Sequence, residues 1–514
     1  MRAPSLASAL AVLSLTPAVI SVPLSANSRV ERRASDAERA AAVKDAFEFA
    51  WSGYLEYAFP HDELHPVSNT PGDSRNGWGA SAVDALSTAI IMNNPKIVNK
   101  ILEHISGIDY TKTATEVSLF ETTIRYLGAM LSGYDLLQGT DIAENVKAIT
   151  RPDHVETLLT QSKKLADVMK FAFDTKSGIP YNGLDITAQK PIGEPTNGLA
   201  TTGTLVLEWM RLSDLTNDPK YGELAAKAES HILNPKPKKF EPFPGLIGSN
   251  FDVNTGLLLN GKVSWNGGAD SAYEYLIKMF AYDQSRFKLY KDRWILAAES
   301  TMKHLKSSPS SRKDLIYLAS YEDGKLNLDS QHLTCFDGGN FILGGQILKR
   351  KDFLDFGLKL TEGCRNTYHS TVTKIGPESF GWDTGKIPDD QKDFYNKNGF
   401  YINNGDYNLR PEVIESYYYA YRATGDSMYQ DWVWEAFVAI NETTRTDTAF
   451  TAIKDVNAKD GGEKRDNQES FLFAEVMKYA YMTFAPEGDW QVARDGKNKY
   501  VYNTEAHPFR VKSA

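Results

Sequence analysis

Apolar residues recur at helical spacing through most of this 514-residue chain, from about Asp36 onward. Runs of strict alternation between apolar and polar residues, which are typical of half-buried strands, are few and short. The sequence therefore predicts a mostly α-helical protein, with helix ends placed to within a few residues. The clearest candidate helices span residues 36–58, 78–92, 122–137, 152–173, 203–216, 271–282, 411–424 and 471–484.

Two of the expected connections between helices resemble each other. Residues 215–221 and 423–429 each lead from one apolar-periodic segment into another. Repeated helical hairpins build either an open solenoid or a closed toroid, and the lack of a strict period favours the closed form. No linker rich in Pro, Gly or Ser divides the sequence, so we expect residues 36–511 to form a single domain.

The charge balance excludes one class of partner. The chain has 57 Lys and Arg against 66 Asp and Glu, which gives a net charge of -9. Nucleic-acid-binding proteins need clustered Lys and Arg to displace counterions from the phosphate backbone, and the sequence has no such cluster. We therefore expect a globular protein that does not bind nucleic acid.

Residues 1–33 differ from the rest of the chain. A basic residue precedes an apolar stretch, residues 6–24, which Pro17 and Pro23 interrupt. This pattern is typical of a secretory signal peptide, followed here by a short pro-segment ending at the dibasic pair 32–33. The alternative is an uncleaved membrane anchor, but a span needs about 20 apolar residues. We expect a protein that is secreted or lies in the secretory pathway lumen, with no membrane insertion after signal cleavage.

The chain contains two cysteines, Cys335 and Cys364. In an oxidising compartment a lone pair is more often bridged than free, so we expect a disulfide; the alternative is two buried thiols. One sequon, which begins at Asn441, offers a site for N-glycosylation if it is exposed.

Several expected helices have a carboxylate at or beside their first turn. The simplest interpretation is capping, because an acid there complements the helix dipole and the unpaired N–H groups. Aromatic residues surround these acids, however, and further acids lie one or two helical turns away. The first group is Glu121, Asp270, Glu378, Glu412 and Glu469, and the second is Glu274, Glu415 and Glu475.

In a toroid the inner helices all begin on the same side, so these carboxylates would converge on one mouth. A glycosidase requires this combination. One acid protonates the leaving oxygen, one base activates water, and flat aromatic faces hold the pyranose ring. The pattern therefore indicates a site that cleaves sugars.

Common metal-binding motifs are missing from the sequence, which has no Cys-x-x-Cys, no His-Glu-x-x-His and no EF-hand loop. A hard cation such as Ca²⁺ could still take the hydroxyl and carbonyl of Thr504, together with waters held by carboxylates. His507, three residues later, is more typical of a structural histidine than of a ligand.

At these residues the sequence resembles glycoside hydrolase family 47, the class I α-mannosidases, and most of all their secreted filamentous-fungal members. The similarity runs from about Ala46 to Pro508, and many motifs in the same order are far more specific than any one alone. The motifs are Asp62-Glu63-Leu64-x-Pro66, Gly77-Trp78-Gly79, Phe120-Glu121-Thr-Thr-Ile-Arg125, Asp270-Ser-Ala-Tyr-Glu274, His332-Leu-Thr-Cys335, Arg410-Pro-Glu412-x-x-Glu415, Glu469-Ser-Phe471 and Asn503-Thr504-Glu505-Ala-His507-Pro508.

The resemblance implies an all-α fold, an (α/α)7 barrel of helical hairpins with minor β-hairpins. It also implies a Ca²⁺ ion bound directly by Thr504 and inverting hydrolysis of terminal α-1,2-linked mannose from high-mannose N-glycans, from Man9 towards Man5. The ion would meet hydroxyls of the bound mannose, so it would orient and distort the sugar rather than generate hydroxide. Nothing in the sequence indicates an obligate partner, and we expect a monomer.

Carried over residue by residue, Glu412 matches the family's general base. Glu121 matches the candidate general acid, acting through a water, whereas Asp270 competes for that role and Glu378 is counted among the active-site acids. Inversion needs the acid and the base about 6.5 to 9.5 Å apart, which leaves room for the water. The residues that match sugar-binding positions or the family disulfide are Arg125, Glu274, Arg410, Glu415, Phe471, Glu475 and Glu505, and the pair Cys335 and Cys364.

Three positions depart from the family pattern. Ser87 and Thr122 differ from many members without removing a group from the expected chemistry. Gly268 stands where endoplasmic-reticulum-type members resemble one another in carrying arginine. A glycine there predicts a roomier subsite and cleavage of several α-1,2 linkages.

Two other functions compete with this interpretation. One is a non-catalytic mannose-glycan-binding lectin on the same barrel, like the family's quality-control relatives. A lectin need not keep both acid and base, whereas this chain keeps the full acid set together with Thr504. The other is an inverting glucosidase on a different α/α barrel, which the motif from Thr504 to His507 disfavours.

Overall fold

The computed structural model describes residues 34–138 and 151–512, so the predicted signal and pro-segment, residues 1–33, lies outside the described residues. The residues from Asp36 onward form one compact unit. Helices make up most of its regular structure, which confirms the predicted all-α class. Within the described ranges, no helix combines the length and the apolar character that a membrane span requires.

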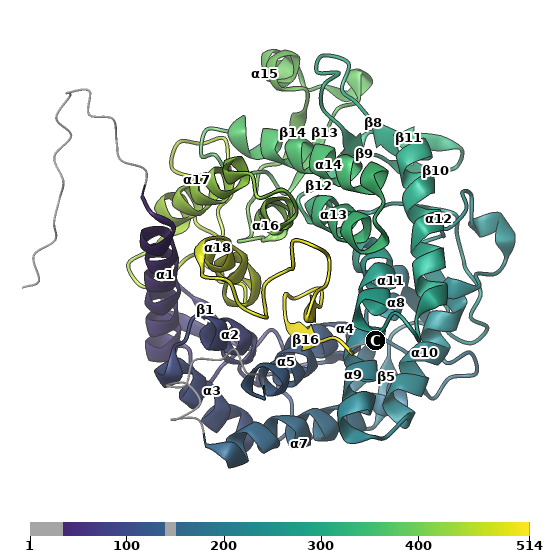
Figure 1. Ribbon diagram of the computed structural model, residues 1–514, viewed down its shortest axis with the longest axis vertical. Coiled ribbons are helices and arrows are strands. Elements are labelled where there is room, and N and C mark those ends of the chain that lie inside the picture. Colours follow the sequence, from purple (N-terminus) through teal and green to yellow (C-terminus); the bar gives the residue numbers. More distant parts are fainter. Residues whose placement is uncertain (1–33, 139–150, 513–514) are drawn as a thin grey trace, which may run out of the picture. The chain divides into compact units, whose positions relative to one another are not determined.

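The helices of this unit lie in two layers around a common centre (Figure 1). Each inner helix packs against an outer partner, and α18 packs against α1, which closes the ring. The closed (α/α)7 barrel that the sequence predicts is therefore confirmed. The pairs, inner helix first, are α2 (Ala80–Ile91) with α3 (Pro95–Gly107), α5 (Gly128–Leu137) with α7 (Pro152–Met169), α9 (Val206–Thr216) with α10 (Lys220–Leu233), α11 (Asp270–Tyr282) with α12 (Lys288–His304), α13 (Phe336–Leu348) with α14 (Lys351–His369), α16 (Glu412–Thr424) with α17 (Ser427–Thr444), and α18 (Met477–Phe484) with α1 (Asp36–Tyr57).

Burial explains which helices lie inside. Every residue of α2 is buried, whereas α12 buries one stripe that includes Tyr290 and Trp294. A helix that is apolar on all sides belongs in a core, and an amphipathic one belongs at a surface. Small residues let the two layers approach closely, since a Cβ added to Gly344 of α13 would lie only 2.1 Å from the Trp294 ring.

Two inner helices begin with a π-helical turn that the sequence did not predict. π-turns occur mostly as single turns at functional sites. Here one carries Arg125 and the other carries Glu475, two predicted site residues. The first follows α4 (Leu119–Thr122) as η1 (Thr123–Leu127) and leads into α5, and the second, η7 (Leu472–Val476), leads into α18.

Short antiparallel strands connect the helices, as the expected minor β-hairpins. They form seven small sheets within the described residues. These are β1 (Glu63–His65) with β2 (Thr70–Gly72); β3 (Val117–Ser118), β4 (Gly183–Asp185) and β5 (Lys190–Ile192); β6 (Thr196–Gly198) with β7 (Asn250–Asp252); β8 (Lys306–Ser307) with β9 (Tyr317–Leu318); β10 (Ser320–Glu322) with β11 (Lys325–Asn327); β12 (Asp329–Gln331), β13 (Ser379–Gly381) and β14 (Tyr401–Asn404); and β15 (Tyr500–Tyr502) with β16 (Pro508–Arg510).

The prediction that Glu378 begins a helix is wrong. Glu378 directly precedes β13, the central strand of its sheet. Its backbone is held on both sides, since its N–H donates to Asp406 O at 2.8 Å and its carbonyl accepts from His332 N at 2.9 Å. These strand-like bonds leave no free N–H groups for a helical first turn, so the Pro-Glu pair here is not a helix start.

The last hairpin of the described chain lies inside the ring of helices, at its centre (Figure 1). β15 and β16 pair with Tyr502 opposite Pro508, which leaves residues 503–507 as the connecting loop. The two strands pack against inner helices, β15 against α11 and β16 against α5. This hairpin fills part of the centre of the barrel and carries Thr504.

Cys335 and Cys364 form the expected disulfide, which joins the turn before α13 to α14. We expect replacement of both residues by alanine to lower the free energy of unfolding by about 3 kcal/mol, because the unfolded chain regains the freedom of the closed loop. Urea denaturation of the two proteins measures this difference. Neither sulfur lines the large central cavity, and equal stability of the two proteins would contradict the expectation.

Candidate active site

A cavity of about 640 Å³ lies at the centre of the barrel, where the inner helices begin. It is the place where the acidic helix starts were expected to converge. All of the predicted catalytic, sugar-binding and metal-binding residues line it except Glu378. These are Glu121, Arg125, Asp270, Glu274, Arg410, Glu412, Glu415, Phe471, Glu475, Thr504 and Glu505.

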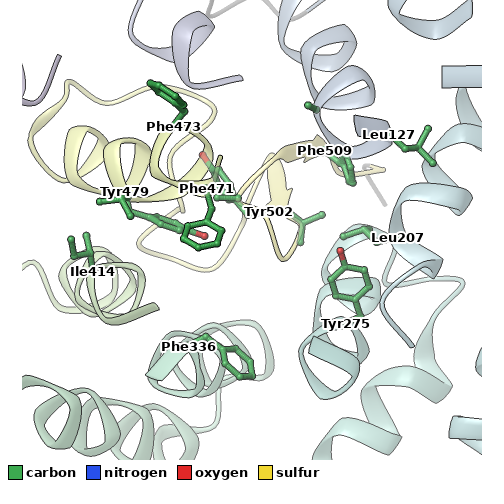
Figure 2. Close-up of a cluster of buried hydrophobic side chains, with 14 of the residues drawn as sticks. Leu127, Leu207, Tyr275, Phe336, Ile414, Phe471, Phe473, Tyr479, Tyr502 and Phe509 are labelled. Atoms are coloured by element: carbon green, nitrogen blue, oxygen red, sulfur yellow. The ribbon is translucent and has the colours of Figure 1, made fainter. Parts of the chain in front are cut away.

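Aromatic rings supply the flat faces that a sugar site requires. Phe471, just before η7, and Phe336, at the start of α13, both line the cavity. Figure 2 shows these rings with Tyr275 of α11, so they come from three separate parts of the inner layer. The guanidinium carbon of Arg125 lies 5.6 Å from the centre of the Phe471 ring. One face of Phe471 is thus held by a cation.

Glu412 is the first residue of α16. Its Oε2 lies 2.7 Å from Nδ1 of His332, and Nε2 of the same ring lies 2.7 Å from the hydroxyl of Tyr368. Both partners are buried. A carboxylate held at one oxygen keeps the other free to accept a proton from water, as a general base requires. The sequence placed His332 in a motif but assigned it no role.

The two candidates for the general acid differ in charge. Burial, together with the charges of Glu274 and Glu412, raises the pKa of Asp270 to about 7 against a lowering bond from Ser271 N–H. Burial also raises the pKa of Glu121, but Arg125 and Arg75 outweigh it and the net shift is downward. Near neutral pH the free protein therefore holds a proton on Asp270 rather than on Glu121.

Arg125 organises one wall of the cavity. Its Nε donates to Glu121 Oε2 at 2.8 Å and its Nη1 donates to Ser470 Oγ at 3.1 Å. The same Nη1 pairs with Glu505, and Asp84 Oδ2 lies 3.5 Å away. A fully buried guanidinium with this many acceptors has a fixed orientation. It holds the carboxylates of Glu121 and Glu505 at its two ends, Nε and Nη1.

Glu378 acts on the cavity through Arg410. Nε of Arg410 lies 2.7 Å from Glu378 Oε2, and Nη2 lies 2.6 Å from Oε1, which is a bidentate ion pair. Burial raises the pKa of Glu378, but its bonds with Arg410 lower it overall. Glu378 is therefore an anion that orients Arg410, and it does not itself line the cavity.

Negative groups outnumber positive ones around the cavity. Burial raises the pKa of Glu415 to about 8. Burial and neighbouring carboxylates also raise the pKa of Glu475 and Glu505 well above the usual range. These acids cannot all ionise unless a cation joins them. The acids that line the cavity are Glu121, Asp270, Glu274, Glu412, Glu415, Glu469, Glu475 and Glu505, against Arg75, Arg125 and Arg410.

The donor set constrains how a metal ion could bind. In the described ranges no three His, Cys, Asp or Glu side chains are grouped closely enough to hold an ion. Thr504 instead offers a hydroxyl and a carbonyl on the cavity wall, with Glu475 and Glu505 on the same wall. Ca²⁺ accepts such oxygens together with waters. The residues present fit a Ca²⁺ ion held by Thr504 and by waters that the carboxylates orient.

A comparison with known protein families shows where this chain belongs. The family model described as Glycosyl hydrolase family 47 matches residues 46–511, which include every element of the cavity. The chain belongs to this family. The resemblance seen in the sequence is thus confirmed over nearly the same range.

Relatives of this family 47 chain are similar over their whole length. A protein named mannosyl-oligosaccharide alpha-1,2-mannosidase from Coccidioides posadasii is 64% identical and covers 99% of each chain. One of the same name from Penicillium citrinum is 61% identical over 98% of each. The solved alpha-1,2-mannosidase from Trichoderma reesei superposes with a TM-score of 0.89 at 48% identity, covering 92% of this chain and 99% of that one.

Buried side chains to which the sequence assigned no role hold the Thr504 loop of this family 47 barrel. Asn503 Oδ1 accepts from the backbone N–H groups of Glu505 and His507, at 2.9 and 2.8 Å. Lys278 Nζ donates to Asn503 O at 3.2 Å, and Lys478 Nζ donates to Ala506 O. Burial lowers the pKa of Lys478 to about 7. These bonds fix the loop on both sides of Thr504.

Two further predicted positions lie as follows. Gly268 lines the cavity with φ at +93°, and a Cβ there would meet nothing within 4 Å. The roomy subsite remains a prediction. Asn441 lies in α17 on the outer layer, half-buried, and its Oδ1 accepts from Arg445 Nη1 at 3.0 Å. Glycosylation there also remains a prediction.

Proposed function

We propose that this family 47 protein is a Ca²⁺-dependent α-1,2-mannosidase that trims high-mannose N-glycans from Man9 towards Man5 with inversion. One observation carries the proposal: Glu412 and the acid candidates Glu121 and Asp270 face the same cavity beside sugar-stacking rings. The names of the relatives, mannosyl-oligosaccharide alpha-1,2-mannosidases, support the linkage and the substrate class. We further propose that residues 1–33 direct the protein to the secretory pathway and that residues 36–511 act as a monomeric domain.

The chemistry is a single displacement. Glu412 accepts a proton from water, the water oxygen bonds to C1 of the terminal mannose, and the glycosidic bond breaks. A protonated carboxyl, Asp270 or Glu121, gives its proton to the leaving oxygen. Phe471 stacks on the sugar face, while Arg125 and Arg410 hold hydroxyls. The product is β-mannose from an α-linked substrate.

A Ca²⁺ ion would be held by the hydroxyl and carbonyl of Thr504 and by waters on Glu475 and Glu505. When bound, it would orient hydroxyls of the mannose and favour a distorted ring. The chain's own contribution is to hold Thr504 in place through Asn503 and Lys278.

The direct test is release of mannose from a Man9 N-glycan by the purified protein, with the anomer of the product followed by NMR. We expect β-mannose first, and no release from α-1,3- or α-1,6-linked mannobiosides. Initial α-mannose would contradict inversion. Tight binding of the glycan without release would favour the lectin, and release of glucose would favour the glucosidase.

The pKa of Asp270 predicts that it is the general acid. Since an acid must be protonated to act, activity should fall as pH rises through about 7. We expect Asp270→Asn to lose most activity on mannobiose but little on α-mannosyl fluoride, because fluoride leaves with little need of a proton. If Glu121→Gln is the variant that keeps fluoride hydrolysis while Asp270→Asn loses both, Glu121 is the acid.

A further inference from the structure

We propose that Tyr368 selects the tautomer of His332 so that Nδ1–H is donated to Glu412, which makes Tyr368 a positioning residue for the general base. The inference deepens the proposed function and rests on the assignment of Glu412 as the base. Tyr368 does not line the cavity, so it acts without touching the sugar.

The three groups form one line of short contacts. Tyr368 is on α14, His332 precedes the turn into α13, and Glu412 begins α16. The hydroxyl of Tyr368 lies 2.7 Å from His332 Nε2, and His332 Nδ1 lies 2.7 Å from Glu412 Oε2. His332 is 2% exposed and Tyr368 is 0% exposed. Water therefore has no access to either ring nitrogen.

A neutral imidazole carries one N–H, and the bond made by one nitrogen decides which nitrogen holds it. Burial raises the pKa of Tyr368 well above its usual value, so the phenol keeps its proton. The Tyr368 hydroxyl has a second hydrogen-bond partner in Tyr407. When its proton is donated to Nε2 of His332 instead, the ring's own proton must sit on Nδ1, where it faces Glu412. In the other tautomer the Nδ1 lone pair would face the carboxylate, and the two would repel.

The N–H that His332 donates matters because other carboxyl groups lie around Glu412. Like charges disfavour the ionised form of a carboxyl, and a donated N–H favours it. Arg410 supplies a positive charge near Glu412, but its guanidinium also pairs with Glu378. The titratable and charged groups around Glu412 and His332 are Asp270 on α11, Glu415 and Tyr417 near the start of α16, Glu475 on η7, Tyr368 on α14, and Glu378, Tyr407 and Arg410 from the connecting segments.

The sign of the expected effect follows from the role of a base. Glu412 acts as a base only in its ionised form, which a donated N–H stabilises. Losing the Nδ1–H bond removes that stabilisation, so we expect the acidic limb of the kcat/KM profile to move to higher pH.

The first test is Tyr368→Phe. We expect kcat to fall about tenfold, the size of effect typical of one bond to a charged group, with KM nearly unchanged. The acidic limb should move up by about one pH unit. A profile that keeps its shape and position would overturn the proposal, because it would mean that His332 donates to Glu412 whatever Tyr368 does.

Tyr418→Phe is the matched control. Tyr418 is also buried and lies on α16 with Glu412, but its hydroxyl donates to Gln491 Oε1 at 2.7 Å and accepts from Val492 N at 3.0 Å. The variant loses a comparable bond away from the site. It should lose stability without any movement of the pH profile. A shift as large as that of Tyr368→Phe would show that the effect is only structural.

His332 variants supply a test that does not depend on how well Tyr368→Phe folds. The amide nitrogen of His332→Asn can take the place of Nδ1 and donate to Glu412, whereas that of His332→Gln takes the place of Nε2. We expect the acidic limb to stay in place in the Asn variant and to move up in the Gln variant. Adding Tyr368→Phe to His332→Asn should move the limb no further; an additive shift would contradict tautomer selection.

A failure of the proposed function would give a different result from a failure of the tautomer inference. If Glu412→Gln kept full turnover, Glu412 would not be the base and the proposed mechanism would fail first. If Glu412→Gln were inactive while the Tyr368 and His332 variants kept the parent pH profile, the tautomer inference alone would fail.

Discussion

Glu412→Gln is expected to lower kcat by about 10³-fold or more, since general-base catalysis contributes factors of this order. Glutamine cannot take a proton from water, but it keeps the shape of the side chain and an oxygen that can face His332. Binding of the glycan should therefore persist, and calorimetry with a Man9 glycan would measure it. The loss should appear in kcat rather than in KM.

Glu56→Gln is a suitable control for that variant. Glu56 lies on α1 in the outer layer and is exposed, so the same change of charge occurs far from the cavity. Its turnover should equal that of the parent protein. Unchanged turnover in Glu412→Gln would remove Glu412 from the mechanism, whereas loss of glycan binding together with turnover would show that the variant had damaged the pocket.

Removal of calcium should have the second large effect. Chelation with EDTA is expected to abolish activity, and added Ca²⁺ should restore it. Stability offers a second readout, because an ion that binds only the folded state raises the melting temperature with its concentration. We expect a lower melting temperature in EDTA, since Glu415, Glu475 and Glu505 then share one cavity without the cation.

Thr504 variants connect this effect to one residue. Thr504→Ala removes the hydroxyl but keeps the carbonyl, so the Ca²⁺ concentration that gives half of the melting shift should rise. Thr504→Ser keeps both oxygens and should bind Ca²⁺ nearly as the parent does. Full activity in excess EDTA, from protein with no metal by elemental analysis, would contradict the calcium dependence.

Helical periodicity predicted an all-α chain, and the lack of a strict period favoured a closed ring of helical hairpins, whereas the (α/α)7 barrel itself was implied by the family resemblance. A two-layer ring fits the periodicity because it buries each inner helix on all sides and each outer helix on one. The pattern could not predict the π-turns at Thr123–Leu127 and Leu472–Val476. A single π-turn is shorter than the window of about 11 to 18 residues over which helical periodicity is read. Glu378 was misplaced for a similar reason: an acid after proline suits a helix start, and only pairing with distant strands decides otherwise.

The acids of the cavity were predictable as a group, because helices that begin on one side bring their first turns together. Their partners were not. His332 lies 80 positions from Glu412, and Lys278 lies 225 positions from Asn503. Such contacts have no local signature, and a buried lysine or histidine looks in sequence like any other residue of its helix. A match to family motifs found the acids but could not say which residues hold them.

The closure of the ring determines when the protein can begin to work during synthesis. α1 meets the last inner helix, and Arg39 pairs with Asp431 across 392 positions of sequence. The cavity also needs Thr504, on a hairpin made after every helix. A nascent chain on the ribosome therefore contains most of the carboxylates of the cavity before the hairpin that carries Thr504 has been synthesised. We therefore expect a product cut short before Thr504 to be inert rather than weakly active.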